Sequence, residues 1–343
     1  MKPRVTQRDV ARKAGVSHVT VSLALRGAPS IPEKTRKRIE KIANLLGYSP
    51  DPMLTALSSY RKQNRPAAYH ANIAWLRASS ASGSSGSGDF GLYFKGAQAR
   101  ARQLGYMLDE IDLNEGKGDL KWLQRLLDAR NITGLILTPA ASAAGVFEFD
   151  LSRYSAVRIG YSYRSPLLNT VANAQFRTTL TVMQKAVALG YKRIGAVLNQ
   201  EIDERTSWHF LGGYLAGQHL LPRKDRILPF YASPGVALVP AVFDWILKQK
   251  IDCFIAAGYR DLYHGLVQRG LDLSGTIGYA DTQVEEEDEF FSGIHQNSRQ
   301  IGVAAVELLA SMIYRDETGV PDIPSHLLVE GSWHEGETLP RHG

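Results

Sequence analysis

From residue 71 onwards, short apolar runs alternate with longer amphipathic stretches. The apolar runs predict strands at 73–76, 134–137, 157–159, 194–198, 251–256 and 277–279. The stretches between them predict helices at 91–104, 119–129, 175–189, 205–220, 236–249 and 297–314. Strands that alternate with helices are typical of βαβ units on a parallel sheet. Two of these helices end in the same Gly-Tyr turn, at 105–106 and 190–191, which indicates that one α/β unit is used twice.

The first fifty residues show only the helical period and predict three short helices. Thr6 with Asp9 three residues later is an N-terminal capping pattern, and Gly15 ends the first helix. Ser17 caps a second helix, and a third ends at Gly47. Two helices joined by a short glycine turn form a helix-turn-helix, whose second helix enters the major groove of DNA.

Charge divides the chain in the same region. Residues 1–65 hold 14 Lys and Arg against 4 Asp and Glu, a net charge of +10, whereas the rest carries −4 and the whole chain +6. A basic head on a mildly acidic body indicates that the head contacts a polyanion.

One continuous pattern runs through the head: Val5-Thr6-x-x-Asp9-Val10-Ala11-x-x-Ala14-Gly15-Val16-Ser17-x-x-Thr20-Val21-Ser22-x-x-Leu25, followed by Thr35-Arg36 and Leu46-Gly47-Tyr48-x-Pro50. It resembles the headpiece of LacI/GalR-type bacterial transcription regulators. The resemblance implies a helix-turn-helix headpiece at 1–50, a hinge helix and linker at 51–66, and a periplasmic-binding-protein-like core of two α/β lobes.

The resemblance also implies which headpiece side chains contact DNA. Phosphate contacts fall on Thr6, Ser17, Thr20 and Ser22, and base contacts fall on His18, Val19 and Leu23. Arg26 stands where the family usually has asparagine, and we expect it to add a phosphate or base contact. Apolar side chains such as Val19 and Leu23 contact thymine methyl groups, so we expect a half-site read partly through A·T pairs.

Asp51-Pro52 is an N-cap followed by a proline at the first helical position, and it opens a short apolar helix. A two-turn helix is marginal alone in water. In the family that the head resembles, such a helix orders on the operator and inserts a leucine into the minor groove, a position that falls on Leu57. A surface helix lying on the body is the alternative.

By the same resemblance, three crossovers join the lobes, and we expect them near residues 163, 292 and 324. The first lobe then comprises 67–163 with 293–323, and the second comprises 164–292 with 324–343. Ligands of such folds bind between the lobes at the carboxyl ends of the strands. The effector positions of the family fall on or near Phe90, Tyr161, Arg205, Trp208, Phe210, Tyr259 and Asp281.

Most of the charged groups that would fork onto sugar hydroxyls are missing from these positions, and aromatic residues stand in several of them. Two interpretations remain: the aromatic faces stack on a sugar or glycan fragment, or the cleft is filled and a protein partner controls the chain. The serine-glycine stretch 79–88 is expected to be a rim of the cleft, because its spacing matches no phosphate-binding loop.

Other classes of function find little support. There is no run of about 18 apolar residues for a membrane span, no apolar signal at the N-terminus, and a single cysteine, Cys253, expected in the core. We find no catalytic motif and expect no metal or cofactor. The acidic run 285–289 is expected to be a solvated turn.

The sequence therefore predicts a cytoplasmic, nucleoid-associated bacterial regulator. We expect it to be a homodimeric repressor of carbohydrate-related genes that binds a palindromic operator in double-stranded DNA and responds to a small molecule. A solute-binding protein with an N-terminal extension and an enzyme on the same lobes are the alternatives.

Overall fold

The computed structural model describes residues 5–25, 31–48, 71–77, 88–140, 144–231, 236–256, 260–273 and 275–342, with the backbone alone at Ser22, Gly88, Asp89 and Arg260. Arg26, Leu57, Tyr259, the predicted hinge and most of the serine-glycine stretch lie outside these residues. No described helix is both long and apolar enough to cross a membrane.

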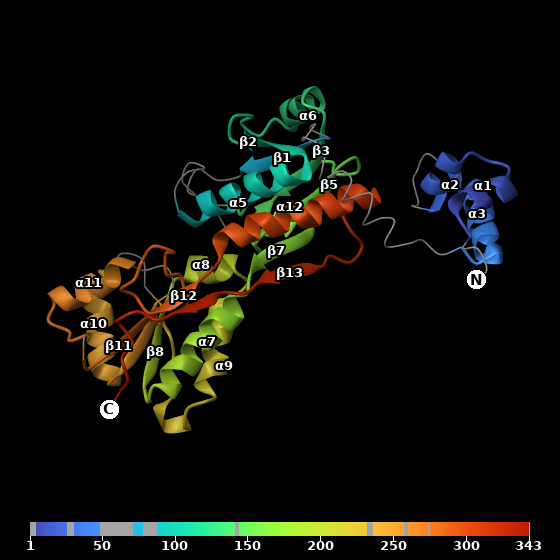
Figure 1. Cartoon of the computed structure of the whole chain (residues 1–343). Helices are drawn as coiled ribbons and strands as arrows, with labels where there is room; N and C mark the ends of the chain where they lie inside the picture. Colours follow the sequence, from blue (N-terminus) through green and yellow to red (C-terminus); the bar gives the residue numbers. More distant parts are fainter. Residues whose placement is uncertain are drawn as a thin grey trace.

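The headpiece consists of α1 (Gln7–Ala14), α2 (His18–Leu25) and α3 (Glu33–Leu46), drawn in blue in Figure 1. The backbone amide of Thr6 donates to the Asp9 carboxylate (3.0 Å), and Gly15 adopts a left-handed conformation with φ of 65°. The three helices enclose a small core of their own, made chiefly of Val10, Ala14, Val21, Ala24, Ile39 and Ala43. The predicted helix-turn-helix is confirmed.

The first lobe contains a six-stranded parallel sheet in the order β13-β7-β5-β3-β1-β2. Its strands are β1 (Ala71–Arg77), β2 (Tyr106–Asp112), β3 (Ile132–Leu137), β5 (Ser155–Ile159), β7 (Asn169–Asn173) and β13 (His326–Val329). Its helices are α5 (Gly88–Leu104), α6 (Leu120–Ala129) and α12 (Ser298–Arg315). The short strands β4 (Gly145–Val146) and β6 (Tyr163–Ser165), which precede and follow β5 in the chain, form a separate two-stranded sheet.

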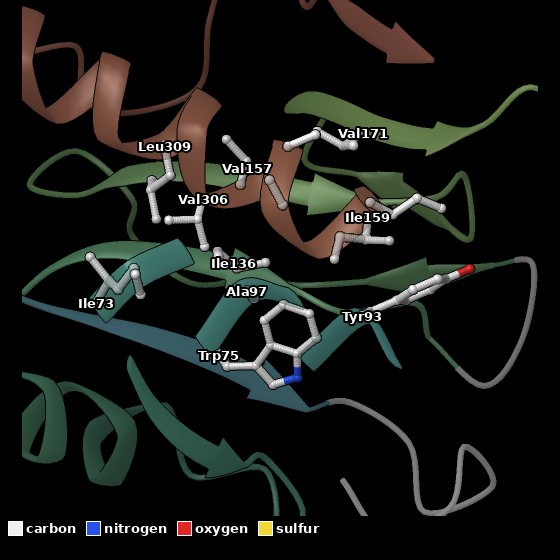
Figure 2. Packing of buried hydrophobic residues seen from close by; sticks show 14 of the residues in the cluster. Ile73, Trp75, Tyr93, Ala97, Ile136, Val157, Ile159, Val171, Val306 and Leu309 are labelled. Carbon is white, nitrogen blue, oxygen red and sulfur yellow. The ribbon is translucent and has the colours of Figure 1, made fainter. Parts of the chain in front are cut away.

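Helices α5 and α12 cover one face of this sheet, and α6 belongs to the core cluster of the other face. Figure 2 shows the first cluster, where Ala97 of α5 and Val306 and Leu309 of α12 meet Ile136 and Val157 of the sheet. The two helices approach closely: a Cβ placed on Gly302 would lie 1.8 Å from the carbonyl oxygen of Tyr93.

The second lobe contains a six-stranded sheet in the order β14-β12-β11-β10-β8-β9, in which only the β12–β14 pairing is antiparallel. Its strands are β8 (Ile194–Leu198), β9 (Phe230–Tyr231), β10 (Cys253–Ala256), β11 (Gly278–Asp281), β12 (Gly293–His295) and β14 (Ser332–His334). Its helices are α7 (Gln175–Ala188), α8 (Gln200–Arg205), α9 (His209–Gln218), the 3-10 turn η1 (Arg223–Asp225), α10 (Leu238–Gln249) and α11 (Arg260–Gln268). Cys253 is fully buried, as expected, and burial raises the pKa of its thiol.

Each crossover between the sheets lies later in the chain than we expected. β7 and β13 still pair within the first sheet, and β12 already belongs to the second, so the chain crosses at 174, at 296–297 and at 330–331. The expected lobe boundaries at 163, 292 and 324 are therefore displaced. Asn169–Asn173 is a short strand with polar ends, so its hydrophobic pattern is too weak to reveal it.

The helix expected at 205–220 begins later, as α9 at His209, and the separate short helix α8 precedes it. Ser207 and Trp208 adopt left-handed conformations, with φ of 55° and 61°, and separate α8 from α9. The break places Arg205 at the end of one helix and His209 at the start of the next.

Candidate nucleic-acid interface and interlobe cavity

Helix α2 has one buried face and one exposed face. Val21 and Ala24 pack in the headpiece core, whereas the side chain of His18 is exposed and the side chains of Val19 and Leu23 are 57% and 36% exposed. Apolar side chains held in water on a small domain are commonly part of an interaction surface. The three residues expected to read bases thus share the outward face of this helix.

The polar residues at the starts of α1 and α2 already hold local hydrogen bonds. The Ser17 hydroxyl accepts from the backbone amide of Thr20 (3.1 Å), which caps α2, and lies 2.8 Å from the Thr20 hydroxyl. The Thr6 hydroxyl donates to the Asp9 carboxylate (2.7 Å), and these bonds lower the pKa of Asp9. A phosphate at Thr6 must therefore compete with Asp9 for the same proton. No acidic residue stands in the first turn of α2, which leaves its positive end open to an anion.

A cavity of about 260 Å³ lies between the two lobes. The first lobe contributes residues of α5 and of the segment after β5, and the second contributes the start of α7 and the region of α8 and α9. The lining consists of Phe90, Tyr93, Pro139, Ile159, Gly160, Tyr161, Ser162, Asn173, Gln175, Ile202, Arg205, Thr206, Phe210, Gln283 and Gln296.

Four of the residues expected in the cleft lie in this lining: Phe90, Tyr161, Arg205 and Phe210. Trp208 is not part of the lining, because the left-handed turn leaves its side chain 44% exposed. Asp281 is also absent from it. Its carboxylate accepts from the Tyr279 hydroxyl (2.9 Å) and from the backbone amide of Gln283 (2.8 Å), so it supports the lining residue Gln283 from behind.

The cavity also contains polar residues that the sequence did not reveal, among them Tyr93, Asn173, Gln175, Gln283 and Gln296. Three of them flank or occupy the first two crossovers. Polar residues immediately beside a crossover could have indicated this wall. We expected the crossovers at other positions, so this signal was missed.

Several of these side chains form a chain of hydrogen bonds between the lobes. The Tyr93 hydroxyl donates to Asn173 Oδ1 (3.2 Å), and Asn173 Nδ2 donates to the carbonyl oxygen of Gln296 (3.2 Å). Gln296 Nε2 in turn donates to the carbonyl oxygen of Thr282 (2.9 Å). This chain ties α5 and two crossovers to the second lobe along the wall of the cavity.

Two polar atoms of the lining have no partner among the described residues. They are Gln175 Oε1 and Arg205 Nε, and both are buried. A buried polar atom without a hydrogen bond costs about 1–3 kcal/mol. These two atoms can therefore accept a hydrogen bond (Gln175 Oε1) or donate one (Arg205 Nε) to a molecule in the cavity.

Beside the cavity, Tyr161 lies between two histidines. Its ring centroid is 4.8 Å from that of His209 and 5.4 Å from that of His326. Burial raises the pKa of Tyr161, and burial followed by the neighbouring His326 lowers the pKa of His209. Among the described residues, no group of three or more His, Cys, Asp or Glu could hold a metal ion.

A helix-turn-helix domain joined to a two-lobed, periplasmic-binding-protein-like core defines the class of this protein. Residues 6–51 match the family model of bacterial regulatory proteins of the lacI family. This match covers the headpiece, and the core is compared below through its fold.

Curated relatives match over a length similar to that of the headpiece. The chain is 49% identical over 47 residues to the probable HTH-type transcriptional repressor ExuR of Bacillus subtilis (strain 168). It is 50% identical over 48 residues to the HTH-type transcriptional repressor CytR of Escherichia coli (strain K12). In both comparisons the match spans 14% of this chain and only 14% of the relative.

Solved structures match over the whole fold. The lac repressor dimer bound to operator and the anti-inducer ONPF superposes with a TM-score of 0.57 at 17% identity, covering 98% of this chain and 100% of that one. The complex of the transcriptional regulator CelR with cellobiose gives 0.55 at 16% identity, with the same coverage. These similarities show the fold.

Proposed function

We propose that this protein is a transcriptional repressor that binds a palindromic operator as a homodimer. In this proposal a small molecule in the interlobe cavity favours one arrangement of the lobes, and the headpieces bind DNA in only one arrangement. The effector then acts by shifting a population between two states. A two-fold dimer suits a palindromic site, because each headpiece contacts one half.

The exposed face of α2 is the observation that carries this proposal. Three side chains that the core does not need, His18, Val19 and Leu23, stand together on the helix that a helix-turn-helix inserts into the major groove. Phosphate contacts from Thr6, Ser17, Thr20, Ser22 and Arg26 would fix the orientation without reading sequence. Because Val19 and Leu23 offer only van der Waals contact, thymine methyl groups are their expected targets.

Selection of binding sites from a random duplex pool tests the proposal with the purified full chain. We expect a palindrome of about 14–20 base pairs with A·T pairs in each half-site and an easily deformed central step. A half-site made only of G·C pairs would contradict the proposed base contacts, and no enrichment by the folded protein would contradict operator binding.

Val19→Ser sharpens this experiment. It removes methyl groups from the proposed reading face, so the base preference opposite that residue should weaken in the selected sites. The matched control is Leu45→Ser, which changes another exposed apolar residue of the headpiece, on α3. It should leave the selected sequence unchanged.

The cavity supports the second half of the proposal, control by a small molecule. Its lining combines the aromatic side chains of Phe90, Tyr161 and Phe210 with several amide and hydroxyl groups, a composition typical of small-molecule sites. Such a lining suits a sugar-like effector that stacks on aromatic faces. The remaining open space is the observation that disfavours a cleft filled by its own side chains.

A further inference from the structure

The charge in the interlobe cavity is one-sided. Among the described lining side chains, Arg205 is the only charged one, and no carboxylate accompanies it. The stretches of the core outside the described residues, 78–87, 141–143, 232–235, 257–259 and 274, contain no charged residue. Asp89 and Arg260 are charged residues whose side chains are not described, and Asp89, which precedes Phe90 in sequence, is included in the test below.

Arg205 and Gln175 both have side-chain hydrogen-bonding atoms that no described residue uses. The side chain of Arg205 forms no ion pair or hydrogen bond with the described residues, and its Nε atom is buried. Gln175, only 6% exposed, leaves its Oε1 acceptor without a partner. The cavity thus offers a cationic donor and a neutral acceptor that nothing in the described chain uses.

The start of α7 adds positive potential to the same cavity. Gln175 is the first residue of this 14-residue helix, and the N-cap residue Ala174 provides no side-chain hydrogen bond. No acidic residue lies in the first turn. The unshared amides of a helix N-terminus carry a partial positive charge and favour an anion.

Other polar groups of the lining are already committed. The Ser162 hydroxyl accepts from the backbone amide of Ala140 (2.8 Å), and Asn173 and Gln296 belong to the chain of hydrogen bonds between the lobes. These groups shape the cavity, and Arg205 and Gln175 remain available to hold a ligand.

We propose that the effector is a small hydroxycarboxylate, of which a sugar acid is the type. Its carboxylate pairs with the Arg205 guanidinium near the start of α7, a hydroxyl donates to Gln175 Oε1, and its body packs on Phe90 and Phe210. A guanidinium matches a carboxylate in geometry and charge. A volume of about 260 Å³ suits a molecule of monosaccharide size. This inference rests on the effector site of the proposed function.

Titration calorimetry of the full chain with matched acid and neutral pairs tests the inference. The probes are galacturonate with galactose, glucuronate with glucose, and gluconate with glucitol, because the members of each pair differ at the carboxylate. We expect at least one acid to bind, about tenfold or more tighter than its neutral counterpart, as a charge-assisted hydrogen bond provides. The preference should decrease as salt is added.

Variants separate the roles of the two arginines near this site. Arg205→Gln should reduce the affinity for the acid about tenfold or more and abolish the preference over the neutral partner. The control is Arg177→Gln. Arg177 is an exposed arginine in the first turn of α7, where Gln175 also lies, but it pairs with Glu330 (2.7 Å) and does not line the cavity. Both Arg177→Gln and Asp89→Asn should leave the preference for the acid in place.

The opposite results would overturn the inference: no acid binds, the neutral partners bind as tightly, or Arg205→Gln retains the preference. Site selection with the same Arg205→Gln protein distinguishes the two proposals. An enriched palindrome together with equal binding of acid and neutral sugars rejects the acidic effector and retains the repressor. Preferential binding of an acid without any enrichment of DNA sites retains the acidic effector and rejects the repressor.

Discussion

Single residues determine how closely the two helices of the first lobe approach. Gly96 of α5 and Gly302 of α12 each face backbone of the other helix, and Cβ atoms there would lie 2.0 Å from the Arg299 carbonyl oxygen and 1.8 Å from the Tyr93 carbonyl oxygen. A backbone atom cannot move aside as the end of a flexible side chain can, so a Cβ at either position would push the two helices apart. The contact therefore positions Tyr93, which begins the hydrogen-bond chain along the cavity.

Gly302→Ala should lower the free energy of unfolding by about 1–3 kcal/mol, the usual cost of overpacking, despite alanine's higher helix propensity. It should also weaken effector binding, because Tyr93 must move. The measurement is chemical denaturation followed by circular dichroism. Gly212→Ala is the control: its added Cβ meets only the half-exposed ring of Phe176 at 3.3 Å, so stability should be unchanged or slightly higher.

At the residue scale, the sequence revealed part of the cavity. Phe90, Tyr161, Arg205 and Phe210 could be placed because the fold brings the carboxyl ends of parallel strands to one edge. Gln175, missed from the sequence, is a glutamine at a helix start, and no local pattern separates such a residue from a solvated one.

At the scale of elements, three segments meet beside the cavity: the turn after β5 with Tyr161, the start of α9 with His209, and the start of β13 with His326. They belong to different lobes, so their packing contributes to holding the lobes together. A proton on His209 would be placed in a partly buried site, at a helix N-terminus and beside another histidine, all of which disfavour the charge.

The stability of the protein should therefore fall in mild acid. His209 has a lowered pKa in the folded chain and a pKa near 6.5 in the unfolded chain, so the unfolded chain binds more protons between these values. The contribution is present above about pH 6.5 and is lost as the pH decreases through the lower, folded value. Thermal unfolding midpoints measured from neutral to mildly acidic pH check this expectation.

His209→Gln should flatten that part of the pH profile. Asp203 lies nearby and acts with the opposite sign, because burial raises its pKa, and comparison with the parent chain removes its contribution. His219→Gln, a change to an exposed histidine at the other end of α9, should leave the profile unchanged. An unaltered profile in His209→Gln would assign the acid sensitivity to other groups.

The proposed hinge is an element whose role can be tested separately. Leu57→Ala should abolish DNA bending and most of the specific affinity, because a leucine wedge unstacks the central base step. Bending measured by energy transfer across the selected operator, with calorimetry for the effector, checks both properties. Bending that persists in the variant would show that residue 57 is not the wedge.

Elements with strong sequence patterns were predicted well, whereas the misplaced crossovers come from strands with weak patterns. The helix-turn-helix has capping residues and glycine turns that fix its boundaries locally. In contrast, β7, β12 and β13 contain three to five residues each, and partners distant in sequence determine their membership of a sheet. Their order, and with it every crossover, is a property of tertiary pairing.

At the scale of the whole molecule, the headpiece and the core have separate hydrophobic clusters. Arg205→Gln should therefore leave operator selection without ligand unchanged, and Val19→Ser should leave effector affinity unchanged within about twofold. Fluorescence anisotropy with operator DNA and calorimetry with the effector measure the two affinities. A substantial loss of both in either variant would contradict this modularity.

The second and third crossovers are also bound to each other, since Asn297 Nδ2 donates to the carbonyl oxygen of Glu330 (2.8 Å). Together with the chain from Tyr93 through Asn173 and Gln296, this places the ligand wall and the interlobe connections in one network. If the cavity holds an effector as proposed, a substitution that alters ligand selectivity at this wall should also alter the balance between lobe arrangements without ligand. Under the proposed function, a change of effector at this wall would therefore require a compensating change in DNA affinity without ligand.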